Sequence, residues 1–345
     1  MGFDEGGWAE VARKPSRPQP KAAGQENTAP RTQAPDPRRQ KGPSTPSLKK
    51  ALDEVCSKLD KRAWGKDWEK IQLKAGANRP YDVAELPENQ PKNRYYDVLP
   101  FDYNRVLLHP KDYINASLVK AKDEEIQHGN AWHFIAAQGP LEETAADFWR
   151  MIMEQYTKQI VMLTRTEEQN TRGEVVEKCC CYFPVAVGDS QLHGSLTVKL
   201  LSIAQPNADL VIRRFSITNA QINDTWEVDH FQFISWPDQG ATTKGNGTLL
   251  DLIRRLESTG AVEMAKREPP VIHCNTGIGR TGVFIALAVI LRRLAQMPPN
   301  YTPNGMDIVC MRDVLIELRR QRMGLISNIR QYAMLHEAVR DWLRS

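Results

Sequence analysis

The sequence predicts an α/β fold in which helices flank a mixed β-sheet. Two observations lead to this class. From about residue 48 onward, segments with strand composition alternate with segments of helical periodicity, without a long break. In the middle of the chain, several predicted strands follow one another with no helix between them, which a purely parallel sheet does not allow. There is no internal repeat, so one large domain is the simplest arrangement.

The individual elements follow from composition and spacing. The predicted strands are rich in Val, Ile, Phe and Thr, and they cover residues 132–137, 159–163, 178–183, 196–203, 210–218, 228–236 and 270–274. The predicted helices carry apolar residues three and four positions apart, and they cover residues 144–156, 247–257, 279–294, 307–322 and 328–343.

The N-terminal segment has a different character. Residues 1–48 are rich in Pro, Gln, Arg and Lys and show no hydrophobic period, so we expect a disordered basic tail before a domain over residues 49–345. The spacing of Pro15 and Pro18 also fits a partner that binds polyproline helices, whereas the simpler interpretation is a solvated tail.

Composition excludes several classes of function. A net charge of +4 over 345 residues is too small for a dedicated nucleic-acid binder. The longest apolar run, residues 283–291, is too short to span a membrane, and the N-terminus has no signal-peptide core. The six cysteines include no CxxC pair, and the run at 179–181 has no histidine at ligand spacing. We therefore expect a cytoplasmic monomer with reduced thiols, no metal and no cofactor.

The strongest candidate site surrounds Cys274, in the segment VIHCNTGIGRTG at residues 271–282. A short apolar strand leads to the cysteine and a helix begins just after it, so the sulfur lies near a helix N-terminus, which favours anions. Gly277 and Gly279 allow the backbone to curl until successive amides point at one anion. Arg280 has a planar fork suited to two phosphate oxygens. The positive electrostatic field of the helix N-terminus, the loop amides and Arg280 favours the thiolate form of Cys274, which is a nucleophile for phosphoryl transfer.

A chance match, a structural cysteine and a protease site all fit this segment less well. Cys56 and Arg62 have the same Cys-x5-Arg spacing without a glycine between them, so spacing alone is not diagnostic. A purely structural cysteine would leave the two glycines and Arg280 without a role. A Cys–His protease does not fit, because His273 and Cys274 are neighbours on a strand and point to opposite faces. We expect His273 to hydrogen-bond the loop from behind.

An ester oxygen that leaves phosphorus needs a proton, so a carboxylic acid is expected nearby on a mobile loop. The best candidate is Asp238 in the segment WPDQG at residues 236–240, which follows a predicted strand and contains turn residues. Trp236 is expected to anchor this loop. Alone the segment is an ordinary turn signal, and it gains weight from the cysteine loop that follows it.

These segments closely resemble the protein tyrosine phosphatases, specifically the non-receptor kind with a single catalytic domain. The resemblance covers about residues 60–343. Besides the two loops it includes the blocks KNRYYD (92–97), VLPFD (98–102), DYINAS (112–117), QGP (138–140), DFW (147–149) and RMGLI (322–326). The resemblance implies a strongly twisted mixed sheet flanked by helices, no metal, and phosphotyrosine-containing proteins as substrates.

The resemblance also implies catalytic roles. Cys274 attacks phosphorus and forms a phosphocysteine, while Asp238 protonates the leaving oxygen and then activates water. Thr281 donates a hydrogen bond to the sulfur, and Gln331 helps to place the water. The phosphoryl oxygens are held by Arg280 and by the backbone amides of Asn275, Thr276, Gly277, Ile278 and Gly279.

Further positions are assigned by the same resemblance. Tyr95 resembles the aromatic wall that makes the pocket deep enough for phosphotyrosine but unproductive for phosphoserine. Asp97 resembles the residue that hydrogen-bonds the substrate backbone. Glu168 and Lys178 correspond to a pair of loop residues near the acid loop. The basic segment 319–322 is interpreted as a solvated face, with attraction of acidic peptides as the alternative.

Two departures from the family pattern bear on activity. Asn275 and Thr276 stand where Ser-Ala is usual, and we expect little loss because backbone amides hold the phosphate. Ser327 replaces a glutamine that normally helps to position the hydrolytic water. A slow or inactive phosphotyrosine-binding module is therefore an alternative to an active enzyme. A dual-specificity or phosphoinositide phosphatase is another, although such enzymes typically lack the wall at 92–97.

Overall fold

The computed structural model describes residues 61–74, 79–109, 112–121, 132–170, 172–222, 224–236, 246–258, 268–295 and 311–344. The predicted tail at 1–48 and its boundary lie outside these residues. So do residues 237–245, which include Asp238, and the first residues of the helix predicted over 307–322.

An eight-stranded mixed sheet lies at the centre of the described fold, in the order β1-β2-β10-β3-β9-β8-β7-β6. Strands β2, β10, β3 and β9 are parallel to one another, whereas β1 and the series β9-β8-β7-β6 pair antiparallel. The strands are β1 (Ala116–Lys120), β2 (His133–Ala137), β3 (Gln159–Met162), β6 (Ser190–His193), β7 (Leu196–Asn207), β8 (Leu210–Asn219), β9 (Asp224–Phe233) and β10 (Val271–His273). The mixed α/β class predicted from the sequence is confirmed.

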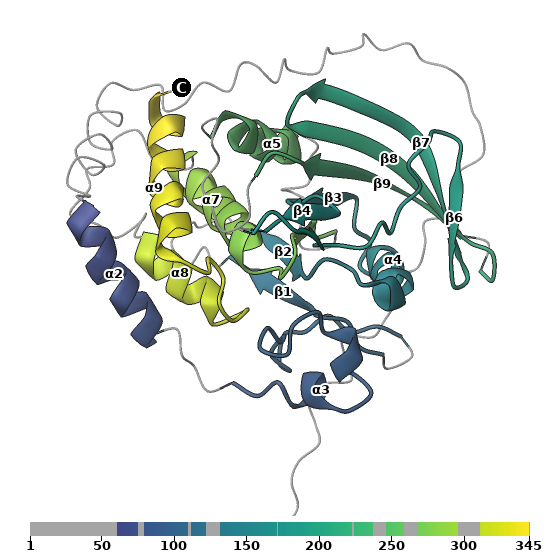
Figure 1. Cartoon of the computed structure of the whole chain (residues 1–345), viewed down its shortest axis with the longest axis horizontal. Coiled ribbons are helices and arrows are strands. Elements are labelled where there is room, and N and C mark those ends of the chain that lie inside the picture. Colours follow the sequence, from purple (N-terminus) through teal and green to yellow (C-terminus); the bar gives the residue numbers. More distant parts are fainter. Residues whose placement is uncertain are drawn as a thin grey trace, which may run out of the picture. The chain divides into compact units, whose positions relative to one another are not determined.

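Helices cover both faces of the sheet (Figure 1). They are α2 (Lys61–Lys74), α3 (Asp82–Glu85), α4 (Ala145–Glu154), α5 (Gly247–Ser258), α7 (Gly279–Ala295), α8 (Met311–Arg319) and α9 (Ile329–Arg344), with 3₁₀ turns η2 (Gln90–Lys92) and η3 (Glu142–Thr144). In β3 and just beyond it, Val161 and Leu163 face the cluster around α5, α7, α8 and α9, whereas Ile160 and Met162 face the cluster around α4. Burial on both faces explains the continuous apolar run of this parallel strand.

The strand predicted over residues 178–183 is wrong. The amides of Lys178 and Cys179 both donate to the carbonyl of Thr166, and the amide of Cys180 donates to Pro140. Because neither Thr166 nor Pro140 belongs to a strand, the segment joins no strand ladder among the described residues. It is apolar because Cys179, Cys180, Tyr182 and Phe183 pack in the cluster around α4.

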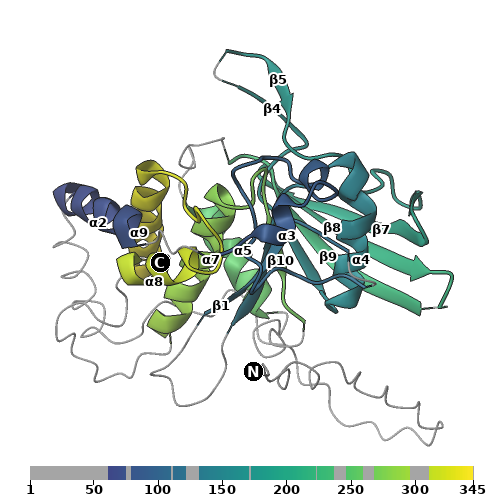
Figure 2. The same ribbon diagram turned by 90° about the horizontal axis from the view of Figure 1, so that it is seen from below.

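Three strand regions were not predicted from composition. These are β1, the edge strand β6, and the hairpin of β4 (Glu167–Gln169) and β5 (Val175–Glu177). Figure 2 shows this hairpin standing apart from the large sheet. Its strands are largely exposed and charged, so no apolar alternation marks them.

The fold brings the candidate cysteine to the carboxyl end of the parallel strands. β10 ends at His273, and α7 begins at Gly279 after a turn of five residues. α7 is apolar on all sides and buried along nearly its whole length, as expected of a core helix. In the described part of the chain, no helix has the length and apolar character needed to cross a bilayer.

Candidate active site

The turn between β10 and α7 holds the sulfur of Cys274 inside a curled backbone. We call this turn with the first residue of α7, residues 274–279, the anion loop. The amide of Gly277 donates a hydrogen bond to Cys274 Sγ over 3.3 Å, and the cysteine is 3% exposed. Gly277 has a φ of +69°, and a β-carbon there would lie 2.2 Å from the carbonyl oxygen of Ala137 in β2. Both the backbone conformation and the close strand therefore require glycine at this position.

The loop is held from behind by Arg322, which is fully buried. Its Nε donates to the carbonyl of Gly277 over 2.8 Å, and its Nη2 donates to the carbonyl of Thr276 over 3.3 Å. In a trans peptide the N–H and C=O point in opposite directions. Because the carbonyls of 276 and 277 point to Arg322, the amides of Gly277 and Ile278 point away from it, toward the sulfur side.

The basic segment 319–322 was interpreted as a solvated face, and this is wrong for two of its arginines. Arg322 also donates to Asn115 and Ser117, and Arg319 donates to the carbonyls of Leu325 and Ile326. Burial lowers the pKa of Arg322 to about 10. Because this value is still well above 7, the guanidinium is charged at neutral pH. Both side chains are buried because they satisfy the carbonyls of irregular backbone around the cysteine loop.

Arg280, in the first turn of α7, points its guanidinium at a carboxylate. Its two terminal nitrogens each lie 2.6 Å from an oxygen of Glu168 in the β4 strand, and Nη1 also donates to the carbonyl of Leu163 over 3.0 Å. Glu168 in turn accepts from the hydroxyl of Thr164. This bidentate pair fixes the plane of the guanidinium beside the anion loop.

His273 lies behind the loop, as predicted. One ring nitrogen faces the hydroxyl of Tyr182 at 2.8 Å and the other faces the carbonyl of Cys274 at 3.4 Å. The same Tyr182 hydroxyl lies 3.0 Å from a ring nitrogen of His230. Complete burial lowers the pKa of His273 to about 4, so the imidazole is neutral at physiological pH. With both nitrogens engaged elsewhere, His273 does not form a dyad with the sulfur.

The predicted hydrogen bond from Thr281 to the sulfur is not present in this structure. The Thr281 hydroxyl is buried and has no hydrogen-bond partner among the described residues, and the sulfur instead accepts from Gly277. Trp236 is buried and packs beside Phe233, so it anchors the residues that lead into the segment of Asp238.

The segment 92–97 lies against the cysteine loop at Tyr95. The side-chain amide of Asn275 is 2.9 Å from the Tyr95 hydroxyl, and Tyr95 is partly exposed. Gln138 accepts from the amide of Arg94 and donates to the carbonyl of Lys92, so it holds the two backbone groups that precede Tyr95. Asp97, the predicted contact for the substrate backbone, is exposed.

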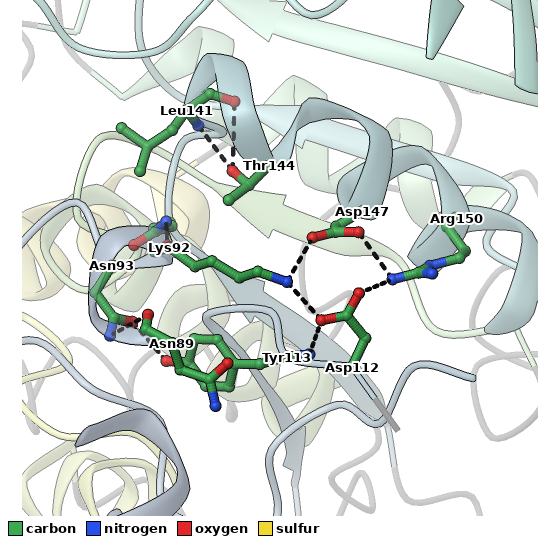
Figure 3. Close-up of polar contacts among 10 residues, drawn as sticks. Asn89, Lys92, Asn93, Asp112, Tyr113, Leu141, Thr144, Asp147 and Arg150 are labelled. Atoms are coloured by element: carbon green, nitrogen blue, oxygen red, sulfur yellow. Dashed lines mark hydrogen bonds and ion pairs between the residues drawn. The ribbon is translucent and has the colours of Figure 1, made fainter. Parts of the chain in front are cut away.

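A ring of four charges supports the start of this segment (Figure 3). Lys92 contacts the carboxylates of Asp112 and Asp147, and Arg150 contacts the other oxygen of each. Burial alone would raise the pKa of Asp112, but the hydrogen bonds from Lys92 and Arg150 outweigh it and lower the pKa to about 2. The ring joins three separate segments, 92–97, 112–117 and α4, through its four ion pairs.

Comparison with known proteins is consistent with this geometry. The model of the family described as protein-tyrosine phosphatase matches residues 89–341. The chain belongs to the protein-tyrosine phosphatase family.

Two curated relatives support the assignment. The chain is 36% identical over 261 residues to tyrosine-protein phosphatase non-receptor type 20 of Rattus norvegicus, a match that covers 75% of this chain and 56% of the relative. It is 37% identical over 270 residues to receptor-type tyrosine-protein phosphatase C of Homo sapiens, covering 76% of this chain and 19% of the relative. The chain thus spans little more than half of the first relative and about a fifth of the second. The resemblance inferred from the sequence motifs is confirmed.

In this tyrosine phosphatase domain, Gln331 and Ser327 lie against the anion loop. Both the amide and the hydroxyl of Ser327 are 3.0 Å from Gln331 Oε1. A β-carbon at Gly279 would lie 2.8 Å from Gln331 Nε2. The side-chain amide of Gln331 is therefore oriented, with its oxygen on Ser327 and its nitrogen beside Gly279.

The tertiary structure therefore gathers most of the residues predicted for the phosphatase site. Cys274, Gly277, Arg280, Gln331 and Tyr95 converge on one loop. The supporting residues that were not assigned a role from the sequence include Arg322, Tyr182 and His230. For Arg322 the available signal was the block RMGLI, which marks the family but does not indicate a contact.

Proposed function

We propose that this chain hydrolyses phosphotyrosine in proteins through a phosphocysteine intermediate, with residues 49–345 as its catalytic domain. The observation that carries the proposal is the hydrogen bond that the sulfur of Cys274 accepts from the amide of Gly277, two residues before α7 begins. A turn that offers amides and a helix N-terminus to a sulfur stabilises the thiolate, and it offers the same groups to a phosphoryl oxygen.

The reaction has two steps. In the first, Cys274 attacks phosphorus, a sulfur–phosphorus bond forms, and the bond from phosphorus to the phenolic oxygen breaks. Asp238 gives its proton to that oxygen. Arg280 and the amides of 275–279 stabilise the charge on the transferring group.

In the second step, water attacks phosphorus and the sulfur–phosphorus bond breaks. Asp238, now a carboxylate, takes a proton from the water, and phosphate leaves with the thiolate restored. Gln331 places the water, and its position against Gly279 supports that role.

A slower reaction, or phosphotyrosine binding without turnover, is the second candidate. The observation in its favour is Ser327, which stands where the family usually has a glutamine. Its hydroxyl donates a hydrogen bond to Gln331 and so fixes that glutamine from one side. A polyproline-binding partner for the N-terminal tail stays a prediction, because that segment lies outside the described residues.

The test is a Cys274→Ser variant assayed on a phosphotyrosine peptide. A serine hydroxyl is not ionised at neutral pH, so turnover should be lost while the phosphopeptide still binds. Cys181→Ser is the matched control, because Cys181 is an exposed cysteine outside the loop, and it should keep wild-type turnover. Vanadate should inhibit the wild type, and metal chelators should not. Turnover by Cys274→Ser would refute the mechanism.

A second arm of the same assay addresses the acid. Asp238→Ala should lower kcat by roughly 10²–10⁴-fold, the usual contribution of a placed proton donor. The fall in rate at high pH should disappear with it. Near-native rates would assign the proton transfer to another carboxylate.

A further inference from the structure

The side chain of Asn275 links the anion loop to the aromatic residue beside it. Its Nδ2 lies 2.9 Å from the hydroxyl of Tyr95, which is 180 residues earlier in the chain. A tyrosine hydroxyl both donates and accepts, so the contact persists if the amide oxygen and nitrogen exchange places.

Asn275 is an unfavourable residue for stability at this point. The residue is 7% exposed, and its Oδ1 is buried without a hydrogen-bond partner in the described structure. An unpaired buried amide oxygen destabilises a fold, and a smaller apolar residue would avoid that cost. The side chain is therefore better explained by its contact with Tyr95 than by packing.

Tyr95 is fixed at its backbone but needs support at its hydroxyl end. Gln138 holds the neighbouring backbone, and the guanidinium of Arg94 donates to the carbonyls of Gly139 and Pro140 at 3.1 and 2.7 Å. The Tyr95 residue itself is 37% exposed. A partly exposed ring that is tethered only through its backbone loses rotamer freedom when a ligand binds, whereas a ring held at both ends has lost it already.

We propose that Asn275 is a positioning residue: its side chain holds the Tyr95 ring in place beside the loop that binds the phosphate, and so strengthens the binding of phosphotyrosine. This inference rests on the proposed hydrolysis of phosphotyrosine. Asn275 acts through Tyr95, while its backbone remains part of the anion loop. The backbone of the loop therefore binds the phosphate, and the Asn275 side chain fixes the aromatic ring beside it.

The experiment is a double-mutant cycle on a phosphotyrosine peptide. Asn275→Ala and Tyr95→Phe should each raise KM about threefold to tenfold, the range expected for one hydrogen bond of ordinary strength. Since both changes remove the same contact, the double variant should be no worse than the more impaired single variant. Tyr103→Phe is the matched control, because it removes a hydroxyl that bonds to the carbonyl of Arg320, and it should leave KM unchanged.

Two further readouts separate positioning from a structural role. Inorganic phosphate has no ring, so its inhibition constant should be the same for wild type and Asn275→Ala. The unfolding midpoint of Asn275→Ala should not fall, because the substitution removes an unpaired oxygen. If the KM increases of the two single variants multiply in the double variant, the proposal is overturned. So would a phosphate inhibition constant that rises in parallel with KM.

The wild type distinguishes failure of this inference from failure of the proposed function. If the wild type turns over substrate but the KM increases of the single variants multiply, only the positioning role of Asn275 is refuted. Absence of wild-type turnover refutes the hydrolase. The same cycle is then measured as the Kd of the phosphotyrosine peptide by calorimetry, where multiplying effects would again overturn the positioning role.

Discussion

Gly277→Ala is the substitution that most directly tests the geometry of the anion loop. A β-carbon at this position would lie 2.2 Å from the carbonyl oxygen of Ala137, more than 1 Å inside ordinary contact, which begins at 3.4 Å. The obstacle is the backbone of β2, which cannot rotate away as a side chain can. The turn must therefore shift, and with it the amide that donates to Cys274 Sγ.

The chain offers two matched glycines for comparison. Gly188 has a φ of +94° and no heavy atom within 4 Å of an added β-carbon, so Gly188→Ala introduces backbone strain alone. A β-carbon at Gly279 would lie 2.8 Å from Gln331 Nε2 and 3.0 Å from Ser327 Oγ, and both are side-chain atoms that can move. The loss of stability and activity is expected to increase from Gly188→Ala to Gly279→Ala and to be largest for Gly277→Ala.

The magnitudes follow from these contacts. Gly188→Ala should cost about 1 kcal/mol of unfolding free energy, the cost of a left-handed residue, and should leave turnover unchanged. Gly277→Ala should cost more than that. It should also lower kcat/KM on a phosphotyrosine peptide by roughly 100-fold, because a displacement of about 1 Å in a catalytic group has that effect.

Urea denaturation and steady-state kinetics on all three variants make the measurement. A Gly277→Ala enzyme with kcat/KM within about twofold of wild type, and a stability loss no larger than that of Gly188→Ala, would refute this account of the loop. Gly279→Ala keeps the test decisive if the Gly277 variant does not fold, since an undisturbed Gly279→Ala enzyme would contradict the packing of Gln331 on the loop.

Two further predictions concern the second step and the pH dependence of stability. Ser327→Gln should speed hydrolysis of the phosphocysteine, so the pre-steady-state burst of phenol from an aryl phosphate should shrink, and Gln331→Ala should slow the second step more than the first. His336 is buried between Trp64 and Tyr332, with no partner among the described residues for either ring nitrogen, and burial lowers its pKa to about 4. The unfolded chain thus binds a proton below about pH 6.5 that the folded chain does not, so stability is complete above 6.5 and falls toward 4 by up to about 3 kcal/mol. His336→Phe keeps the ring packing and should flatten this part of the curve.

Each of these predictions has a clear contrary outcome. No burst in the wild type, with an unchanged or slower Ser327→Gln enzyme, would show that the site places its water in another way. For His336, denaturation is followed between pH 4 and 7 with the exposed His109→Gln as control. A His336→Phe curve that parallels the wild type would mean that other groups account for the acid sensitivity.

The sequence alone determined the features that depend on neighbouring residues. The glycines around Cys274, the start of α7 at Gly279 and the mixed character of the sheet were all predictable, because turn chemistry and hydrophobic period are local properties. The same locality explains the error at 178–183, where an apolar run reported burial but carried no information about a partner strand. The exposed hairpin of β4 and β5 left no apolar alternation to detect.

Only the tertiary structure decided which distant residues complete the loop. Arg322 reaches the carbonyl of Gly277 from 45 residues away, Glu168 pairs with Arg280 across 112 residues, and Tyr95 meets Asn275 across 180. Such contacts depend on strand order and on the crossing of β10 between β2 and β3, which no periodicity encodes. The proposed nucleophile, Cys274, is thus readable from its own segment. The contact from Tyr95, the support from Arg322 and the pairing of Glu168 with Arg280 are products of the fold. Each is brought to the loop by a separate part of the sheet or its connections.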